Sequence, residues 1–464
     1  MQVFIRGGRR YLAAVLYAWL YVWTAMILFS PTFLMDPVPH DSSVFMSTTR
    51  TIITFFASAL LFKYFLYMFI SPWYDVLWAR KKRYYPALTI DHIPKVSVII
   101  PAWNEEVGLI TTVKSVLNNS YPHIELVVVN DGSTDQSDVL MRRFITAYAK
   151  KKSVTKNITY TYVQNGGKGK ALNTALALAT GEFIVTIDAD CIVEKNAIAN
   201  FVDHFRDPHV MALVGNVKIG NTKTFFGMLQ HLEFLFSFYF KKVDSILNTI
   251  YIIGGAAGAF RREVFEKIGV YNSHNITEDI DLSVRIQKAG MKIAYASDAI
   301  VYTEGATDFS GLIKQRLRWK RGRFDTFKEH SELFFSTKKI HNLLLTWGIL
   351  PFAIFGDVQL SLEIFFVLLL YCFAFITHDF SQFISAVTIV AFMFFVQMVF
   401  DEVKKKDVRI YSLAPIGWLM FYVTTIVEVN ALVRSMWGFY RHTEVQWQRW
   451  KRVGVIGIPI ARER

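Results

Sequence analysis

Hydrophobic residues in this 464-residue chain are concentrated near its two ends, on either side of a long mixed block. Residues 11–33 and 51–70 are each apolar over the roughly 20 residues that a helix needs to cross a bilayer. Four more apolar stretches follow at 343–355, 361–376, 383–400 and 413–433. We expect the last three of these to cross a membrane. The first ends at Gly356 and Asp357, which is equally typical of an interfacial or partial helix.

Basic residues beside the apolar segments predict their orientation. Arg6, Arg9 and Arg10 precede the first segment, and Lys and Arg follow the second at 80–83, whereas the loop at 34–49 contains neither. Both flanks, and the block after them, are therefore expected in the cytoplasm of a multi-pass protein of the cell (inner or plasma) membrane. The clusters at 404–406 and 434–464 are both basic, so either the last segment is re-entrant or one cluster breaks the rule.

Composition narrows the choice of partners. Apolar residues make up 53% of the chain and charged residues 19%, which is unusual for a wholly soluble protein. Two cysteines allow neither a disulfide framework nor a cysteine-based zinc site. The net charge of +13 comes largely from clusters beside apolar segments, where anionic membrane lipid is a simpler partner than nucleic acid. We therefore expect no nucleic acid, and a small membrane accessory subunit is compatible with the sequence.

The block between the apolar ends has the pattern of an α/β domain with a mostly parallel sheet. Short β-branched runs at 95–100, 126–129 and 183–187 predict buried strands, and helical periodicity separates them. Polar residues follow each run directly, at Pro101–Glu105, at Asp131 and at Asp188–Asp190. Because ligands of such sheets bind beyond the carboxyl ends of the strands, these residues are expected to share one site.

Six short signatures carry a family resemblance. In chain order they are PAWNE (101–105), VNDGSTD (129–135), NGGKGKALN (165–173), DAD (188–190), TED (277–279) and QRLRW (315–319). This set resembles the processive membrane-bound glycosyltransferases of family 2, which include cellulose, chitin, hyaluronan and poly-N-acetylglucosamine synthases. The resemblance implies a nucleotide-binding domain of the GT-A type. The expected organisation is two membrane helices (1–79), the cytoplasmic catalytic domain (80–310), amphipathic interface helices (311–340), and further membrane helices with a basic tail (341–464).

The acidic signatures predict a metal site and a base. Asp188 and Asp190 follow a strand with one residue between them, and by resemblance they bind the donor and its Mg²⁺ or Mn²⁺, with Asp190 as the direct ligand. Asp279, with Glu278 beside it, is expected to remove the acceptor proton. Thr277 is also expected to cap a helix at 281–289, which is compatible with a base mounted rigidly at its start, and Asp281 is expected to be structural.

Further residues are assigned to the two substrates. The resemblance implies that Pro101, Glu105, Asp131, Lys168, Gln315 and Arg318 bind the donor nucleotide, and that Trp319 and Gly255 bind the acceptor. Gln315, Arg318 and Trp319 lie in a segment whose apolar positions Ile313, Leu317 and Phe324 share one helical face. That face predicts a helix lying on the membrane surface.

These features favour an inverting, metal-dependent synthase that adds sugars from a UDP-sugar to a β-linked polysaccharide acceptor and moves the polymer across the membrane. The glycine-rich run at 254–258 favours N-acetylglucosamine polymers over cellulose. Hyaluronan-, chitin- or cellulose-type synthesis stays open, as does transfer of one sugar to a lipid. A catalytically inactive scaffold is disfavoured because all the acidic signatures are present.

Overall fold

The computed structural model describes residues 44–88, 92–150, 156–378, 380–402, 417–441 and 452–455. The chain divides into two compact units. Met1–Tyr74 and Gln359–Thr425 belong to unit 1, and Asp75–Val358 and Ile426–Arg464 belong to unit 2. The expected crossing at 11–33 and the basic cluster at 404–406 lie outside the described residues.

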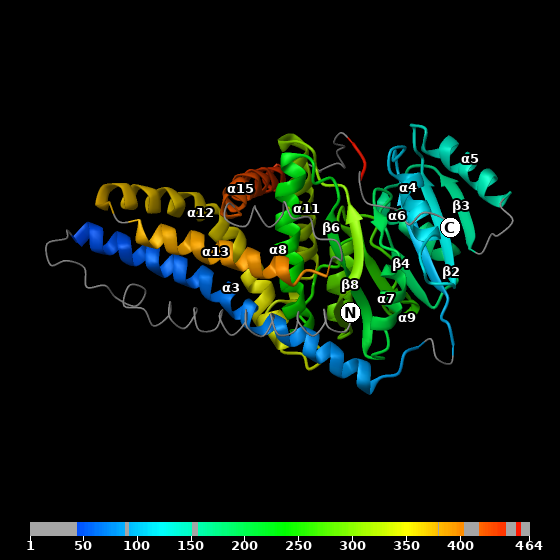
Figure 1. Ribbon diagram of the computed structural model, residues 1–464, viewed down its shortest axis with the longest axis horizontal. Coiled ribbons are helices and arrows are strands. Elements are labelled where there is room, and N and C mark those ends of the chain that lie inside the picture. The colour runs from blue at the N-terminus through cyan, green and yellow to red at the C-terminus, as the bar shows by residue number, and fades with distance from the viewer. Residues whose placement is uncertain are drawn as a thin grey trace, which may run out of the picture. The chain divides into compact units, whose positions relative to one another are not determined.

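An eight-stranded sheet forms the centre of unit 2 (Figure 1). Its strand order is β3-β2-β1-β4-β7-β6-β8-β5. The bounds are β1 Val96–Ala102, β2 Ile124–Asp131, β3 Asn157–Val163, β4 Phe183–Thr186, β5 Ile192–Val193, β6 Val210–Ile219, β7 Gly258–Arg261 and β8 Lys292–Thr303. β1, β2 and β6 are buried along their whole length, which explains why their sequences are nearly continuous apolar runs. The three strands predicted from the sequence are confirmed as β1, β2 and β4.

The order of the strands reverses beside β1. The chain runs from β1 to β2 to β3 in one direction, and then returns to place β4 on the other side of β1. The β1–β2, β2–β3 and β1–β4 pairs are all parallel. In sheets of this kind the crevice beyond the carboxyl ends of the strands at the reversal is the usual ligand site. The topology therefore places such a crevice between Ala102 and Asp188.

The expectation of a mostly parallel sheet is only partly right, because the sheet is mixed. β7 pairs antiparallel with both β4 and β6, and β5 pairs antiparallel with β8. β7 follows the long helix α8 and the glycine-rich run, and it enters the sheet between β4 and β6. The alternation of strands and helices in the sequence predicts parallel strands. It therefore does not predict β7, which lies antiparallel to both of its neighbours.

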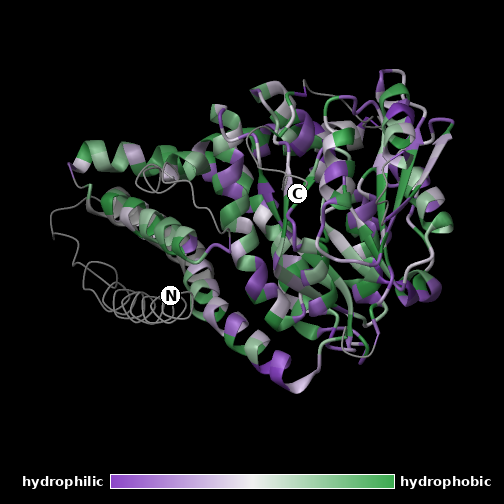
Figure 2. Ribbon diagram, turned by 45° about the vertical axis from the view of Figure 1, so that its right-hand side comes forward, coloured by the Kyte–Doolittle hydropathy of each residue, from purple (hydrophilic) through white to green (hydrophobic). Residues whose placement is uncertain are grey.

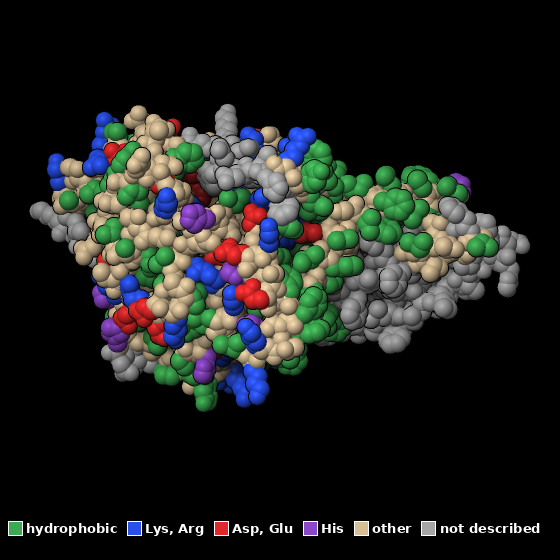
Figure 3. Space-filling view, turned by 180° about the vertical axis from the view of Figure 1, so that it is seen from behind, with side chains coloured by type: hydrophobic (Ala, Val, Ile, Leu, Met, Phe, Trp, Pro, Cys, Tyr) green, Lys and Arg blue, Asp and Glu red, His purple; other side chains and the backbone are tan. Residues whose placement is uncertain are grey.

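Helices cover the sheet of unit 2. They are α4 Leu109–Leu117, α5 Ser137–Ala149, α6 Lys168–Leu178, α7 Ala197–His204, α8 Phe225–Leu247, α9 Arg262–Ile268, α10 Glu278–Lys288 and α11 Phe309–Glu329. α6 packs on β1 and β2, and α8 packs on β6 and β8. Figure 2 shows hydrophobic strands behind helices that alternate between hydrophobic and hydrophilic positions, as expected for helices with one buried face. On the face of unit 2 in Figure 3, acidic and basic side chains are interspersed.

Apolar helices follow the sheet region of unit 2. They are a π-helical turn, Leu344–Ile349, that continues into α12 (Leu350–Thr377), then α13 (Ser381–Val399) and α15 (Trp418–Tyr440). The segment 51–70 lies within α3, Val44–Tyr84. Among the described residues, two helices are long and apolar enough to cross a membrane, Leu344–Thr377 and Trp418–Gly438.

The expected break at Asp357 is wrong. The stretches at 343–355 and 361–376 form one continuous helix through this residue. The carboxylate of Asp357 accepts hydrogen bonds from Lys320 Nζ at 2.7 Å and from Arg323. Because both cations compensate its charge, the helix does not need to end there to expose it to water.

The apolar face predicted for α11 is only partly the face that packs into unit 2, since Ile313 is buried. Phe324, which was assigned to the apolar face, is 49% exposed, whereas Leu312 and Gly322 are buried. A Cβ at Gly322 would lie 2.1 Å from Thr277 Oγ1, so the missing side chain lets α11 approach the start of α10 closely. α11 therefore packs into unit 2 through a face that includes Leu312 and Gly322, and the spacing of hydrophobic residues in the sequence does not predict this face.

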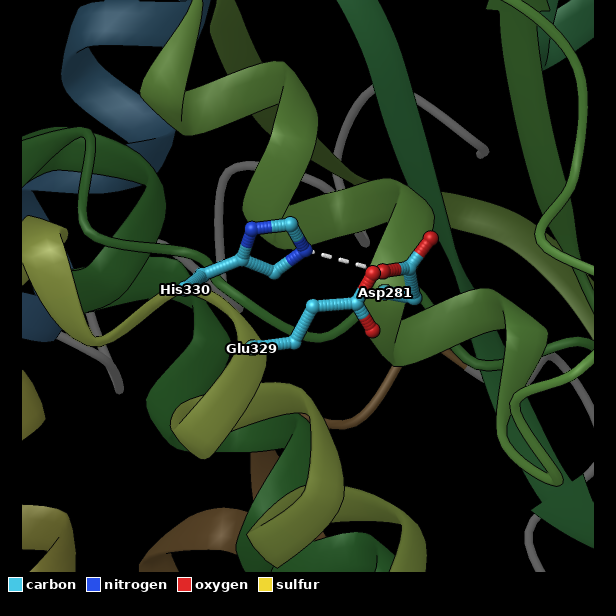
Figure 4. A group of neighbouring side chains, drawn as sticks. All are labelled: Asp281, Glu329 and His330. Atoms are coloured by element: carbon cyan, nitrogen blue, oxygen red, sulfur yellow. Dashed lines mark hydrogen bonds and ion pairs between the residues drawn. The ribbon is translucent and has the colours of Figure 1, made fainter.

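Buried Asp281 connects α10 to the end of α11 (Figure 4). Its carboxylate accepts hydrogen bonds from Arg285 Nε at 2.8 Å and pairs with His330 Nε2 at 2.9 Å. The side chain of Glu329 lies close enough to complete a cluster of three metal-ligating groups. Both carboxylate oxygens of Asp281 already have a partner, however, and this supports the structural role expected for it.

We expect Asp281→Asn to destabilise unit 2 by about 3 kcal/mol at pH 7, because Arg285 would lose its buried counter-charge. Although burial alone would raise the pKa of Asp281, His330 and Arg285 lower it below its usual value. A depressed folded-state pKa stabilises the fold above the unfolded-state pKa of about 3.9, and this contribution is lost as the pH falls through the folded-state value.

The measurement is denaturant unfolding of the full chain in detergent, at pH 7 and again near pH 3. The difference between wild type and Asp281→Asn should shrink at the lower pH. A difference that does not change with pH, or a wild-type stabilisation by Zn²⁺ that the variant lacks, would contradict the ion-pair role.

Candidate functional site

A cavity of about 780 Å³ opens at the carboxyl ends of β1, β2 and β4, where the topology places a crevice. All twelve residues that the sequence assigned to donor, acceptor, metal or catalysis line this one cavity. They are Pro101, Glu105, Asp131, Lys168, Asp188, Asp190, Gly255, Glu278, Asp279, Gln315, Arg318 and Trp319. Residues separated by more than 200 positions are thus brought together.

Asp188 and Asp190 follow β4 directly and form the acidic wall of the cavity. Their side chains are 31% and 11% exposed, so both remain accessible from the cavity. The backbone is tightly held, since a Cβ at Gly108 would lie 3.0 Å from the carbonyl oxygen of Ala189. Thr303 Oγ1 donates a hydrogen bond to Asp190 at 3.3 Å. The two carboxylates offer the hard oxygen ligands that Mg²⁺ and Mn²⁺ prefer, so this donor set fits such an ion.

Lys168 connects this wall to the TED sequence. Its ammonium lies 2.7 Å from Asp188 Oδ1 and 3.2 Å from Glu278 Oε1. Burial alone would lower the pKa of Lys168, but Asp188, Glu278 and Asp279 raise it above its usual value. The lysine is therefore a fixed positive charge among three acids. The sequence suggested only that it reaches the nucleotide or its phosphates.

Asp279 is oriented by the backbone on both of its carboxylate oxygens. Oδ2 accepts a hydrogen bond from the N–H of Gly255 at 2.8 Å, and Oδ1 accepts one from the N–H of Ile280 at 2.9 Å. A Cβ at Gly255 would lie 2.6 Å from Lys168 Nζ, so this position has no room for a side chain. The glycine thus contacts the expected base as well as lining the cavity beside it.

Glu278 differs from its neighbour in its surroundings. Its side chain is 4% exposed and is paired with Lys168. Burial raises its pKa, Lys168 opposes that shift, and Asp279 adds to it. Of the two acids, Asp279 is better placed to accept a proton, because Glu278 is enclosed and engaged with the lysine.

The expected cap position of Thr277 is confirmed, but the helix begins at Glu278 and the threonine side chain makes no capping hydrogen bond. Thr277 occupies the N-cap position of α10, but its hydroxyl donates to Asn275 Oδ1 at 3.1 Å and does not accept from the helix. Close packing against Gly322 explains this, because it leaves the threonine side chain little freedom.

Asp131 organises the glycine-rich loop before α6. Its carboxylate accepts hydrogen bonds from the N–H groups of Gly166 at 2.8 Å and Gly167 at 2.9 Å. Gly167 has a φ of +90°, a conformation that a residue with a side chain rarely adopts. Asp131 therefore stabilises the turn that positions Lys168. It also lines the cavity, where it was expected to contact the nucleoside.

Hydrogen bonds connect the loop that follows β1 to the residues that follow β2, at the edge of the cavity. Asn104 adopts a left-handed conformation with a φ of +57°, and its side-chain carbonyl accepts hydrogen bonds from the N–H groups of Thr134 and Asp135. The N–H of Glu105 donates to Ser137 Oγ at 2.9 Å. These bonds fix the loop from Pro101 against the loop after β2.

α11 places the QxxRW residues on the opposite wall. Gln315 is buried, and its Oε1 has no hydrogen-bond partner among the described residues. Arg318 Nη1 donates to the carbonyl of Ile276 at 3.4 Å. The guanidinium of Arg316 lies 4.3 Å from the ring centre of Trp319 and holds the indole from one side.

The sequence did not predict the ionic network around α11. Arg316 donates to Glu233 of α8 at 2.7 Å, and Lys320 lies 2.9 Å from Glu428 of α15. All four side chains line the cavity. The charged residues of this network lie on separate segments of the chain. No local sequence pattern therefore predicts these ion pairs, and only the fold shows which residues are paired.

The sequence also gave no indication of Arg452. Its guanidinium donates to Asp190 Oδ2 at 2.7 Å and to Glu105 Oε1 at 2.5 Å. Burial raises the pKa of Glu105 to about 8, although Arg452 opposes that shift. The basic residues near the end of the chain were expected to contact lipid or a partner subunit. A single arginine among them does not predict a contact with acids more than 250 residues away in the sequence.

Comparisons with known proteins agree with this geometry. Residues 94–322 match the family described as glycosyltransferase like family 2. Poly-beta-1,6-N-acetyl-D-glucosamine synthase of Staphylococcus aureus (strain COL) is 27% identical over 259 residues, which cover 55% of this chain and 60% of that protein. The protein of the same name from Staphylococcus epidermidis is 25% identical over 355 residues, covering 74% and 82%. The chain thus spans about 60% of the length of the first of these relatives.

A solved structure supports the fold. A mannosyltransferase from Pyrobaculum calidifontis, in complex with GDP-Man and Mn²⁺, aligns with a TM-score of 0.52 at 20% identity and covers 85% of this chain and all of that one. The family match spans the sheet, the cavity acids and the QxxRW helix as far as Gly322. Through residues 94–322, this chain is a family 2 glycosyltransferase.

Proposed function

We propose that this protein transfers N-acetylglucosamine from its UDP-linked donor to the growing end of a β-linked polysaccharide, processively and with inversion. The observation that carries this proposal is the convergence of strand-end acids, an oriented carboxylate and the QxxRW helix on one cavity. The names of the two staphylococcal relatives support the choice of sugar. The apolar helices support placing the reaction at a membrane. The basic residues that flank the first two apolar segments favour its cytoplasmic face, from which the product would pass through the membrane.

On the donor side, Asp190 and Asp188 would hold a Mg²⁺ or Mn²⁺ ion. Such an ion, when bound, would neutralise charge on the leaving diphosphate. The guanidinium of Arg318 suits two phosphate oxygens at once, since its nitrogens form a planar fork. Lys168 adds a further positive charge beside Asp188. Pro101, Glu105 and Asp131 lie where the nucleoside would sit, along the ends of β1 and β2.

On the acceptor side, Asp279 would accept the proton of the attacking hydroxyl as the new glycosidic bond forms and the bond to the diphosphate breaks. Its two backbone hydrogen bonds fix the direction of its oxygens and leave their remaining lone pairs for the acceptor. The indole of Trp319 offers an apolar face to the terminal sugar. A single displacement inverts the anomeric centre, so an α-linked donor gives a β-linked product.

We expect Asp279→Asn to reduce turnover by about 10²–10⁴-fold while donor binding persists, because the amide cannot accept the proton. The measurement uses full-length protein in detergent with Mn²⁺ and a panel of UDP-sugars, and follows UDP release and product size. Glu263→Gln is the matched control, since that acid is 55% exposed and paired with Lys267 outside the cavity.

The expected wild-type result is UDP release and long polymer from UDP-N-acetylglucosamine alone. Single additions to lipid would favour the non-processive alternative. Full activity in Asp279→Asn would contradict the assignment of the base.

We also expect Trp319→Ala to shorten the polymer more than it slows the first transfer, because a weakly held chain end leaves between additions. Product length is measured against the rate of UDP release, with Trp437→Ala as the control, since that indole does not line the cavity. Equal loss of rate with unchanged length would show that Trp319 does not retain the acceptor.

A further inference from the structure

The C-terminal segment of the described chain enters the donor side of the cavity. Arg452 bridges two acids, Asp190 after β4 and Glu105 after β1, with distances of 2.7 and 2.5 Å. Its side chain is 16% exposed, so the contact is largely enclosed. The guanidinium therefore lies between the two strand ends at the reversal of the sheet order.

A second set of contacts holds the same segment through its backbone. The N–H groups of Val453 and Gly454 donate to the two carboxylate oxygens of Glu304, at 2.7 and 3.1 Å. Gly454 has a φ of +76°, which permits the turn that aligns both N–H groups. Glu304 is buried and follows β8, whereas Arg452 contacts the ends of β1 and β4. The segment is thus anchored at two independent points.

This arrangement uses the ligand atoms that the donor's metal ion would need. Asp190 is the residue to which the proposed function assigns direct coordination, and one of its oxygens already accepts from Arg452. Acids enclosed in a cavity need a compensating positive charge. A guanidinium and a divalent cation can each supply it, but they cannot occupy the same position between Asp190 and Glu105.

We propose that Arg452 occupies the divalent-cation position of the donor site, and that the tail and the metal ion bind these carboxylates in competition. The inference rests on the metal assignment in the proposed function. The metal–donor complex must then displace the arginine to bind. The tail acts as a built-in strap that compensates the acids when no donor is present and leaves when the ion arrives.

The test measures Mn²⁺ binding to the full chain in neutral detergent without donor, by electron paramagnetic resonance of the free ion. Arg452→Ala removes the competing charge. Gly454→Pro keeps that charge but removes an N–H donated to Glu304 and cannot adopt a φ of +76°. Arg143→Ala, on the exposed part of α5, is the matched control for the loss of one positive charge.

We expect Arg452→Ala and Gly454→Pro to bind Mn²⁺ at least about tenfold more tightly than wild type, and Arg143→Ala to bind as wild type does. Equally tight binding in Arg143→Ala would show a general charge effect and overturn the strap. Tighter binding in Arg452→Ala with none in Gly454→Pro would show a local effect of the arginine that does not depend on how the tail is anchored, and would also overturn it. Weaker UDP-sugar binding with unchanged Mn²⁺ affinity in Arg452→Ala would assign the arginine to the diphosphate and also overturn it.

Asp190→Asn separates this proposal from the proposed function. If Asp190→Asn abolishes Mn²⁺ binding while Arg452→Ala leaves it unchanged, the metal assignment stands and the strap fails. If neither wild type nor Arg452→Ala binds Mn²⁺, the metal assignment itself fails, and the strap fails with it.

Discussion

The ion pairs of Lys168 connect the proposed donor side and the proposed base side of the candidate site. One partner, Asp188, belongs to the end of β4 and to the donor side, and the other, Glu278, begins α10 beside the expected base. These segments are about 90 residues apart in sequence, and without a cation between them their carboxylates would repel each other. The glycine loop and the empty space at Gly255 both serve to admit this ammonium group. Much of the local geometry is therefore a consequence of one partly buried positive charge.

The same principle recurs around the cavity. Arg452 compensates Asp190 and Glu105, Arg316 compensates Glu233, and Lys320 and Arg323 compensate Asp357. A site that holds a diphosphate and a metal ion, as proposed here, needs charged groups of both signs in an enclosed volume. Pairing each acid with a cation keeps that volume folded until the ligands arrive. Charges that compensate each other in this way can also be exchanged for those of a ligand.

The sequence predicted the parts of this site that depend on local patterns. Apolar runs ending in polar residues located β1, β2 and β4, and the parallel topology then required Pro101, Asp131 and Asp188 to meet. What it could not predict depends on contacts between distant segments. The buried face of α11 follows from Gly322 meeting Thr277, and the entry of Arg452 follows from the path of a tail with no periodic pattern. The antiparallel β7 and the unbroken helix through Asp357 also depend on contacts between distant segments.

The most direct test of this account is a double-mutant cycle between Lys168 and Glu278, measured as the free energy of unfolding of the full chain in detergent. Lys168→Met and Glu278→Gln should each destabilise unit 2, because each leaves the other charge buried with less compensation. The double variant should lose less than the sum of the two, with a coupling of at least about 1 kcal/mol. Additive losses, within about 0.3 kcal/mol, would contradict the claim that Lys168 joins the donor side and the base side into one site.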